Sequence, residues 1–216
     1  MLLALLPGAL PAQNLEAVLS RMDAASASFQ SLTARLRILK YTAIVRDESV
    51  EEGAIWVQRL KRGRSRLLIE FSSPDRYYVA LSDKKAEIYR PKIGQVEEWD
   101  ISRYRDLAEQ IWPFGASGRD LSGRYAISWK GPEAVAGQAA VKLELTPKSE
   151  KLAQNVPRIE TWISTSHWQP VQQKFYDPTP GDFRLSTYTQ VQLNVPLADS
   201  RLKLQLQPGA KRVVQK

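Results

Sequence analysis

The segment from Glu51 to Asp100 restricts the possible folds most, because it reads as a run of short strands joined by tight turns. The strands are AIWVQR, SRLLIEF, RYYVALS, AEIYRP and QVEEW, and each is rich in β-branched or aromatic residues. Turn-forming residues separate them in KRG, SSPD, SDKK and PKIG. Short strands with such short connections predict an antiparallel meander, one face of which must be apolar and covered.

Apolar residues fall on both faces of several of these strands. Because neighbouring side chains of a strand point to opposite faces, Ile55, Val57 and Arg59 share one face and Trp56 lies on the other. The segment SRLLIEF is apolar on both faces in the same way. This pattern predicts a strongly curved sheet that curls around something and is partly covered on its outside.

Two amphipathic segments predict helices that could cover the sheet. The first is Asn14 to Leu32, with Asn14 as N-cap and apolar residues at i, i+3, i+4 and i+7. The second is Asp100 to Phe114, in which Pro113 ends a stripe that contains Tyr104, Leu107 and Ile111. About six strands are predicted between these helices and about six after them, the last of them in RLKLQLQ. Helices segregated beside one antiparallel sheet describe an α+β fold.

The first residues resemble a secretory signal peptide. Residues 1–12 are apolar and uncharged and end in LPA before Gln13, which is a suitable cleavage site. The alternative is a short buried or frayed N-terminal segment. No change of composition divides the remainder, so residues 13–216 are expected to form one domain.

Charge and cysteine content narrow the function. The chain carries 31 Lys and Arg against 23 Asp and Glu, a net charge of +8, which suggests anionic partners such as lipid head groups, acidic proteins or nucleic acid. It contains no cysteine, which excludes disulfides, cysteine-ligated zinc and thiol catalysis.

The sequence offers no support for catalysis. His167 is the only histidine and lies in the turn STSHW near Ser164 and Ser166, but no GxSxG motif frames either serine. A solvated turn histidine is therefore the favoured interpretation. Adjacent glutamates such as Glu97 and Glu98 point to opposite faces of a strand and cannot converge on one ion. We expect a protein that is not an enzyme and has no metal or cofactor.

The loop RLKRGRSR is strongly basic and leaves one alternative of another class open. A site for nucleic acid or an acidic glycan would combine this loop with exposed aromatic residues of the sheet. The residues that could serve are Trp56, Tyr77, Tyr78 and Tyr89. A solvated hairpin tip is the simpler interpretation, and we expect no nucleic acid as a partner.

The order of several motifs resembles the LolA family of periplasmic lipoprotein carriers. GAIWVQR, the turn SSPDR, VALSDKKAEIYRPKIGQVEEWD and the tail PLADSRLKLQLQPGAKRV occur in the family's order. The segments LELTPKSE and PVQQKFYD are similar to those of outer-membrane lipoprotein-sorting proteins. The resemblance extends from Leu15 to Val214. Leu60 stands where the family usually has a proline.

The resemblance implies an incomplete, half-open antiparallel β-barrel whose concave apolar face is covered by helices that act as a lid. Arg59 occupies the position of the family's gating arginine, which hydrogen-bonds the lid backbone and keeps the empty cavity shut. Acyl chains would be bound by nine apolar residues: Ile55, Val57, Leu67, Ile69, Phe71, Tyr77, Tyr104, Leu107 and Ile111.

The resemblance also implies a cargo and partners. The cargo would be an acylated lipoprotein or another lipid, shuttled by a periplasmic monomer from an inner-membrane release complex to an outer-membrane acceptor. A sensor of lipid or lipoprotein with the same fold is an alternative, as is a carrier of a different lipid. The periodicity does not distinguish an open cavity from a fully packed core.

Overall fold

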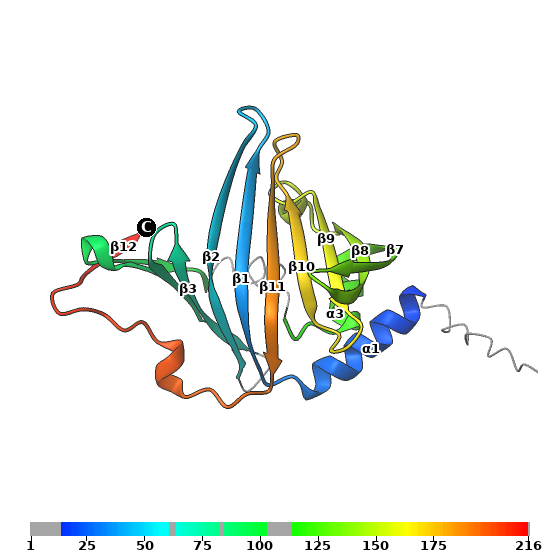
Figure 1. Cartoon of the computed structure of the whole chain (residues 1–216), viewed down its shortest axis with the longest axis horizontal. Coiled ribbons are helices and arrows are strands. Elements are labelled where there is room, and N and C mark those ends of the chain that lie inside the picture. Colours follow the sequence, from blue (N-terminus) through cyan, green and yellow to red (C-terminus); the bar gives the residue numbers. More distant parts are fainter. Residues whose placement is uncertain (1–13, 61–63, 83, 103–113, 216) are drawn as a thin grey trace, which may run out of the picture.

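The computed structural model describes residues 14–60, 64–82, 84–102 and 114–215, and its strands form one sheet of twelve. The strands lie in the order β12-β6-β5-β4-β3-β2-β1-β11-β10-β9-β8-β7 (Figure 1). Every neighbouring pair is antiparallel except β12 and β6, which are parallel. The predicted α+β class and the predicted meander are therefore both confirmed.

One half of the sheet is the meander itself, built from strands consecutive in the chain. These are β1 (Ser31–Thr42), β2 (Asp47–Arg59), β3 (Ser65–Ser73), β4 (Tyr77–Leu81), β5 (Lys85–Arg90) and β6 (Gln95–Asp100). A 3-10 turn, η2 (Pro91–Ile93), joins β5 to β6 and ends at Gly94, whose φ of 60° favours glycine.

The other half of the sheet lies on the far side of β1 and carries most of the described helical structure. Its strands are β7 (Tyr125–Val135), β8 (Gln138–Pro147), β9 (Arg158–Ser164), β10 (Pro170–Tyr176) and β11 (Phe183–Leu193). The helical elements of the described residues are α1 (Leu15–Ser28), α3 (Gly118–Arg124), α4 (Glu150–Ala153) and the 3-10 helix η4 (Asp199–Leu202).

Helix α1 begins as predicted and ends earlier. The side chain of Asn14 accepts a hydrogen bond from Ala17 N at 2.8 Å, so the predicted N-cap is confirmed. The helix stops at Ser28 and not at Leu32, because Leu32 is fully buried within β1. Along α1, Val18 and Met22 pack into the core of the half-sheet β7–β10.

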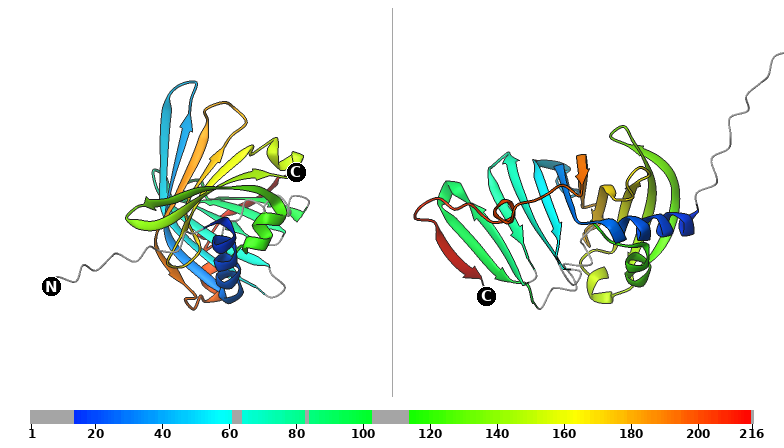
Figure 2. Two further views of the ribbon diagram at one scale, coloured as in Figure 1. Left: turned by 90° about the vertical axis from the view of Figure 1, so that its right-hand side faces the viewer. Right: turned by 90° about the horizontal axis from the view of Figure 1, so that it is seen from below.

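Helix α3 packs directly against α1. A side-chain carbon at Gly118 would lie 2.3 Å from the carbonyl oxygen of Leu19, so only glycine permits this approach. Figure 2 shows the two helices side by side next to the β7–β10 half of the sheet. Helix α3 begins within the segment GASGRDLSG, at a capping box formed by Ser117 and Asp120.

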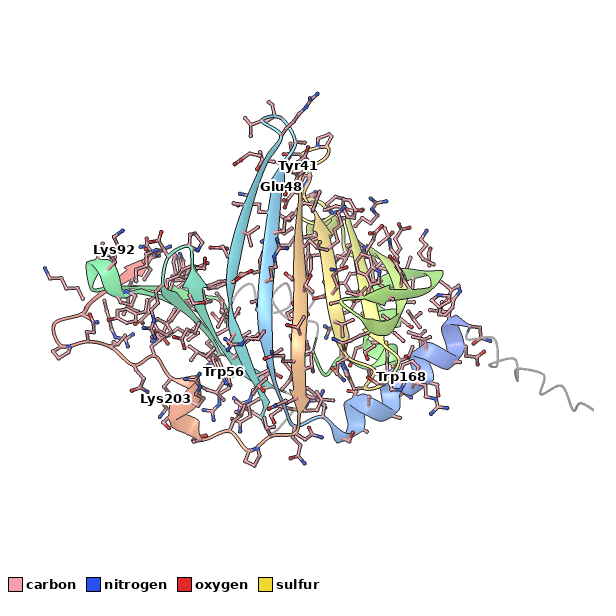
Figure 3. The ribbon with its side chains drawn as sticks, viewed as in Figure 1. Tyr41, Glu48, Trp56, Lys92, Trp168 and Lys203 are labelled. Carbon is pink, nitrogen blue, oxygen red and sulfur yellow. The ribbon has the colours of Figure 1, made fainter. Side chains whose placement is uncertain are left out.

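The two long hairpins are tied together at their tips. Ala43 N donates to Asp182 Oδ1 at 2.7 Å, and the rings of Tyr41 and Phe183 stack with centroids 5.3 Å apart. Tyr41 is labelled in Figure 3 near the β1–β2 tip. The segment RDESVEEG is mostly strand, because β2 starts at Asp47 and pairs with β1 from Asp47 to Gln58.

A second correction concerns the C-terminal part of the chain. RLKLQLQ was predicted to be a strand, but it contains η4 followed by irregular chain. We call residues 195–210 the C-terminal strap. It runs along one side of the sheet (Figure 1), and its Leu197, Leu202 and Leu204 pack on Trp56 and Leu68, on the face of the sheet that we call outer. The face that carries Ile55 and Val57 is called inner.

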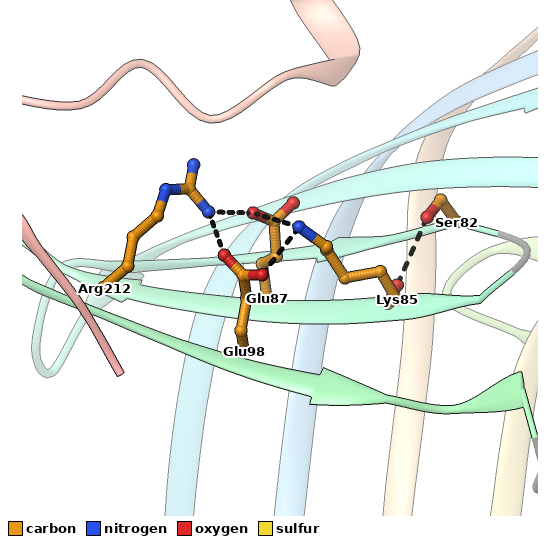
Figure 4. A network of polar contacts seen from close by, with 5 residues as sticks. All are labelled: Ser82, Lys85, Glu87, Glu98 and Arg212. Carbon is orange, nitrogen blue, oxygen red and sulfur yellow. Dashed lines mark hydrogen bonds and ion pairs between the residues drawn. The ribbon is translucent and has the colours of Figure 1, made fainter. Parts of the chain in front are cut away.

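The strap leads into β12 (Lys211–Gln215), which adds to the sheet beside β6. Arg212 donates to Glu87 Oε1 at 2.6 Å and also to Glu98, and Lys85 Nζ lies 2.7 Å from Glu98 (Figure 4). Hydrogen bonds from Lys85 and Arg212 hold the pKa of the Glu98 carboxyl below its ordinary value. This network fixes β12, a strand that the sequence did not predict.

Among the helices of the described residues, none combines the length and the apolar composition that crossing a membrane requires.

Candidate functional site

The inner face of the meander is a continuous apolar surface whose register places four strands in line. One row joins Leu32, Val57, Leu67 and Leu81, and the next joins Ala34, Ile55, Ile69 and Val79. Gly53, Phe71 and Tyr77 continue the third row, in which the rings of Phe71 and Tyr77 stack at 4.4 Å. The structure therefore brings six predicted site residues onto one face: Ile55, Val57, Leu67, Ile69, Phe71 and Tyr77.

The six residues differ in how far they are covered. Val57, Leu67, Ile55 and Phe71 are buried, whereas Ile69 and Tyr77 are only half-buried. Burial and a hydrogen bond to Glu51 raise the pKa of the Tyr77 phenol above its ordinary value. The other three predicted residues, Tyr104, Leu107 and Ile111, lie outside the described residues.

Two phenylalanines from outside the sheet pack onto this inner face. Phe29 caps the end of α1, and Phe114 precedes the turn that leads to α3. Both belong to the same apolar cluster as Val57 and Leu67. Phe114 meets the ring of Tyr188 edge-on, with centroids 4.8 Å apart.

Arg59 is the charged residue at the end of this surface, and it reaches two separate segments. Its Nη1 donates to the carbonyl oxygen of Ser26 at 2.6 Å, and its Nη2 donates to the carbonyl oxygen of Gly115. The guanidinium also lies over the ring of Phe29, 5.2 Å from the centroid. Ser26 lies in the last turn of α1, where unpaired carbonyls and the helix dipole favour a cation.

Gly115 is the point at which these contacts meet. Its φ of +72° favours glycine, and a side-chain carbon would lie 2.6 Å from the ring of Phe29 and 2.7 Å from Arg59. The hydroxyl of Ser26 donates to the Gly115 carbonyl at 2.6 Å. On the other side of the same residue, Gly115 N donates to Gln169 Oε1 at 2.8 Å.

Gln169 is a residue that the sequence analysis missed. It lies just before β10, is 1% exposed, and joins the β7–β10 half of the sheet to the segment that Arg59 holds. In the sequence it is one more polar residue of a turn.

His167 lies in the turn before Gln169 and has no catalytic arrangement. Its Nδ1 accepts from Gln169 N at 3.3 Å, while the hydroxyls of Ser164 and Ser166 bond each other at 2.8 Å. The imidazole is half-buried, which corrects the expectation of a solvated side chain, and this burial lowers its pKa. Within the described residues, no group of three or more His, Cys, Asp or Glu side chains could hold a metal ion.

The four aromatic residues considered for a nucleic-acid site do not share one face of the sheet. Tyr77 lies on the inner face, whereas Trp56, Tyr78 and Tyr89 lie on the outer one, so the four rings are divided between two faces. Tyr89 is 1% exposed, and Arg201 lies 3.6 Å from the ring centroid of Trp56.

The outer face contains a groove of about 410 Å³ beside the strap. Trp56 and Arg201 lie at one side of it, and Arg35, Gln190 and Gln192 line it along β1 and β11. Its lining is largely polar, in contrast with the inner face. The acyl-binding expectation therefore concerns the inner face alone.

Comparison with known proteins shows the fold only. No protein-family model matches the sequence, and no curated protein sequence matches it. Among solved structures, MucB matches with a TM-score of 0.56 and 18% identity over 88% of this chain and 62% of that one. The MucA/MucB complex of Pseudomonas aeruginosa matches with a TM-score of 0.53 and 18% identity, over 88% and 61%.

An uncharacterized conserved protein from Thermus thermophilus matches with a TM-score of 0.56 and 14% identity, covering 94% of this chain and all of that one. A LolA superfamily protein from Nitrosomonas europaea matches at a TM-score of 0.42 and 14% identity, over 89% and 99%, which is too low to assign the chain to that superfamily. The chain spans about 62% of the length of MucB and shares the fold of that part.

Proposed function

We propose that the chain is an exported lipid- or lipoprotein-binding protein that is not an enzyme and takes acyl chains against the inner face of its sheet. The observation that carries the proposal is the pairing of this apolar face with the contacts of Arg59 to Ser26 and Gly115. An apolar face that is closed by a few polar contacts to the backbone can open without breaking the core.

The finer picture follows the resemblance seen in the sequence. The inner face would be the concave side of a half-open barrel, and α1 with residues 103–113 would form its lid. Residues 1–12 would be a signal peptide, and the mature monomer of residues 13–216 would work in the periplasm. Arg59 would be the lid latch, and the nine predicted residues would contact acyl chains, each buried CH₂ contributing about 0.8 kcal/mol.

In the carrier form of the proposal, the protein receives an acylated lipoprotein at an inner-membrane complex and delivers it to an outer-membrane acceptor. Release would require the latch to open, a shift of population that each membrane partner could bias. The net charge of +8 would favour contact with acidic partners.

The test is purification from the periplasm of the native host, followed by mass spectrometry of the lipids and lipoproteins that remain bound. Acylated species in about equimolar amount support the proposal. An empty protein that binds polyanions in a salt-sensitive way would overturn it in favour of the basic-sheet alternative.

A second candidate is a sensor that binds lipid or lipoprotein as a signal. What favours it is the fold shared with MucB, a protein also solved in complex with MucA. A sensor would retain its cargo in the presence of acceptor membranes and bind a partner protein only when loaded. A carrier would lose its cargo to those membranes, so a transfer assay separates the two.

A further inference from the structure

Three buried polar side chains form a row across the inner face of the second half-sheet. Thr161 on β9 lies opposite Gln173 on β10, which in turn lies opposite Ser186 on β11. The exposed fractions of these three residues are 2%, 5% and 8%. The row continues at one end into Leu143 and at the other into Ile38, both part of the inner-face clusters.

Two atoms of this row have no hydrogen-bond partner among the described residues: Thr161 Oγ1 and Gln173 Oε1. Each buried unpaired group costs roughly 1–3 kcal/mol, so a sheet gains nothing from keeping a pair of them. The adjacent pair on the outer face shows the ordinary solution, because Gln172 Nε2 donates to Thr187 Oγ1 at 2.9 Å. On the inner face, Thr161 Oγ1 and Gln173 Oε1 stay unpaired at positions where apolar side chains would stabilise the core more.

The row lies close to the segment that Arg59 holds. Ser186 and Tyr188 are both buried on the same face of β11, and Phe114 packs edge-on against the Tyr188 ring. Phe114 directly precedes Gly115, so any movement of this segment away from Arg59 would lift Phe114 from Tyr188. Opening at the proposed latch would thereby give access to the polar row from the side of the meander.

We propose that Thr161 and Gln173 together bind the amide group that links an acyl chain to the rest of an N-acylated cargo. The Thr161 hydroxyl would donate to the amide carbonyl, and Gln173 Oε1 would accept from the amide N–H. An ester offers only the carbonyl and would leave Gln173 unpaired. The proposal rests on the proposed function, since it names the cargo chemistry of the same inner face.

The test uses the full chain and two probes that differ in one group. N-methylpalmitamide and methyl palmitate would each displace a fluorescent fatty acid from the protein. We expect wild type to bind the amide about tenfold more tightly than the ester, as one additional buried hydrogen bond allows. Gln173→Leu should reduce this preference to about twofold or less, because only Gln173 meets the N–H that the ester lacks. Thr161→Val should weaken both probes by a similar factor of up to about tenfold, because both offer the carbonyl that its hydroxyl would meet.

The outer-face pair supplies the matched control. Thr187→Val removes a hydroxyl from the same kind of pair on the outer face and should leave the tenfold preference intact. In urea unfolding, Thr161→Val should be at least as stable as wild type, whereas Thr187→Val should be less stable. If the Thr161 hydroxyl instead stabilises the folded state through a bound water, Thr161→Val should be the less stable of the two variants.

Three outcomes would overturn the inference. Wild type could show no preference for the amide, or the preference could survive in Gln173→Leu, and in either case the acyl chains still bind and the proposed function stands. If neither probe displaces the fluorescent fatty acid, the proposed function fails together with the inference. If the preference for the amide is found, a second comparison identifies the source of the amide. An N-palmitoylated peptide and a ceramide are each compared with their ester analogue, and the larger preference indicates a protein or a lipid source respectively.

Discussion

Gln169 and Gly115 are 54 residues apart in the chain, and Gln169 Oε1 accepts the hydrogen bond of Gly115 N at 2.8 Å. Arg59 holds the carbonyl of the same residue from the opposite half of the sheet. One glycine is thus held from both sides, by a glutamine at the start of β10 and an arginine at the end of β2. The proposed latch, which the resemblance implied as a single arginine, would therefore consist of two side chains.

Replacement of Gln169 by leucine is expected to destabilise the protein by about 1–3 kcal/mol, because it leaves the buried Gly115 N–H without a partner. Urea unfolding of the full chain measures this free energy. Gln192→Leu, an exposed glutamine on the outer side of β11, is the control and should change it by less than about 0.5 kcal/mol. Equal values for the two variants would mean that Gln169 does not hold Gly115.

Arg59→Leu should loosen the same segment and change the handling of cargo. Without the bonds to Ser26 and Gly115, trypsin should cut more quickly in the sequence between Asp100 and Gly115. The variant should load acyl chains but release them poorly to acceptor membranes. Arg66→Leu is the matched control, because Arg66 bonds Gln58 and does not contact Gly115.

Combining Arg59→Leu with Gln169→Leu tests whether the two side chains act together. Since both hold one peptide segment, their effects on unfolding should differ from additivity by about 0.5 kcal/mol or more. Simple additivity, together with unaltered transfer in Arg59→Leu, would remove Arg59 from the mechanism.

Gly115→Ala should be more harmful than an alanine at Gly137. Both glycines have positive φ, +72° and +76°, so both substitutions carry the conformational cost of about 1 kcal/mol. At Gly137 nothing lies within 4 Å of the added carbon, whereas at Gly115 it meets Phe29 and Arg59. The difference between the two losses of unfolding free energy measures how tightly Phe29 and Arg59 pack against Gly115. A difference near zero would show that Phe29 and Arg59 can move aside for the added carbon at little cost.

The sequence was sufficient for the features that depend on local chemistry. Turn residues and β-branched runs located the meander, and the alternation of side chains placed Arg59 on the same face as Val57. That alternation holds in the structure because β2 pairs in unbroken register with β1. The apolar rows follow directly from this register.

The sequence was misleading or silent where distant contacts decide. The leucines of RLKLQLQ alternate as in a strand. Alternation shows only that one side of a segment is buried, and it does not show that the backbone pairs with another strand. Here Leu202 and Leu204 pack on the outer face of the sheet without such pairing. Gln169 gives no periodic signal, because its partner is brought to it only by the fold. The unpaired Gln173 is likewise visible only once its neighbours on three strands are known.

Glu98→Gln should reduce stability at neutral pH and have a diminishing effect in acid. Because Lys85 and Arg212 hold the pKa of Glu98 below that of an unfolded glutamate, about 4.3, the carboxylate contributes stability above that pH. The contribution is lost as the pH falls through the lowered pKa of the folded state. Urea unfolding at intervals from pH 7 to pH 3 should therefore show the gap between wild type and Glu98→Gln narrowing below about pH 4. Glu48→Gln, at the exposed β1–β2 tip, should show no such change, and a constant gap for Glu98→Gln would mean that the network does not hold β12 through this charge.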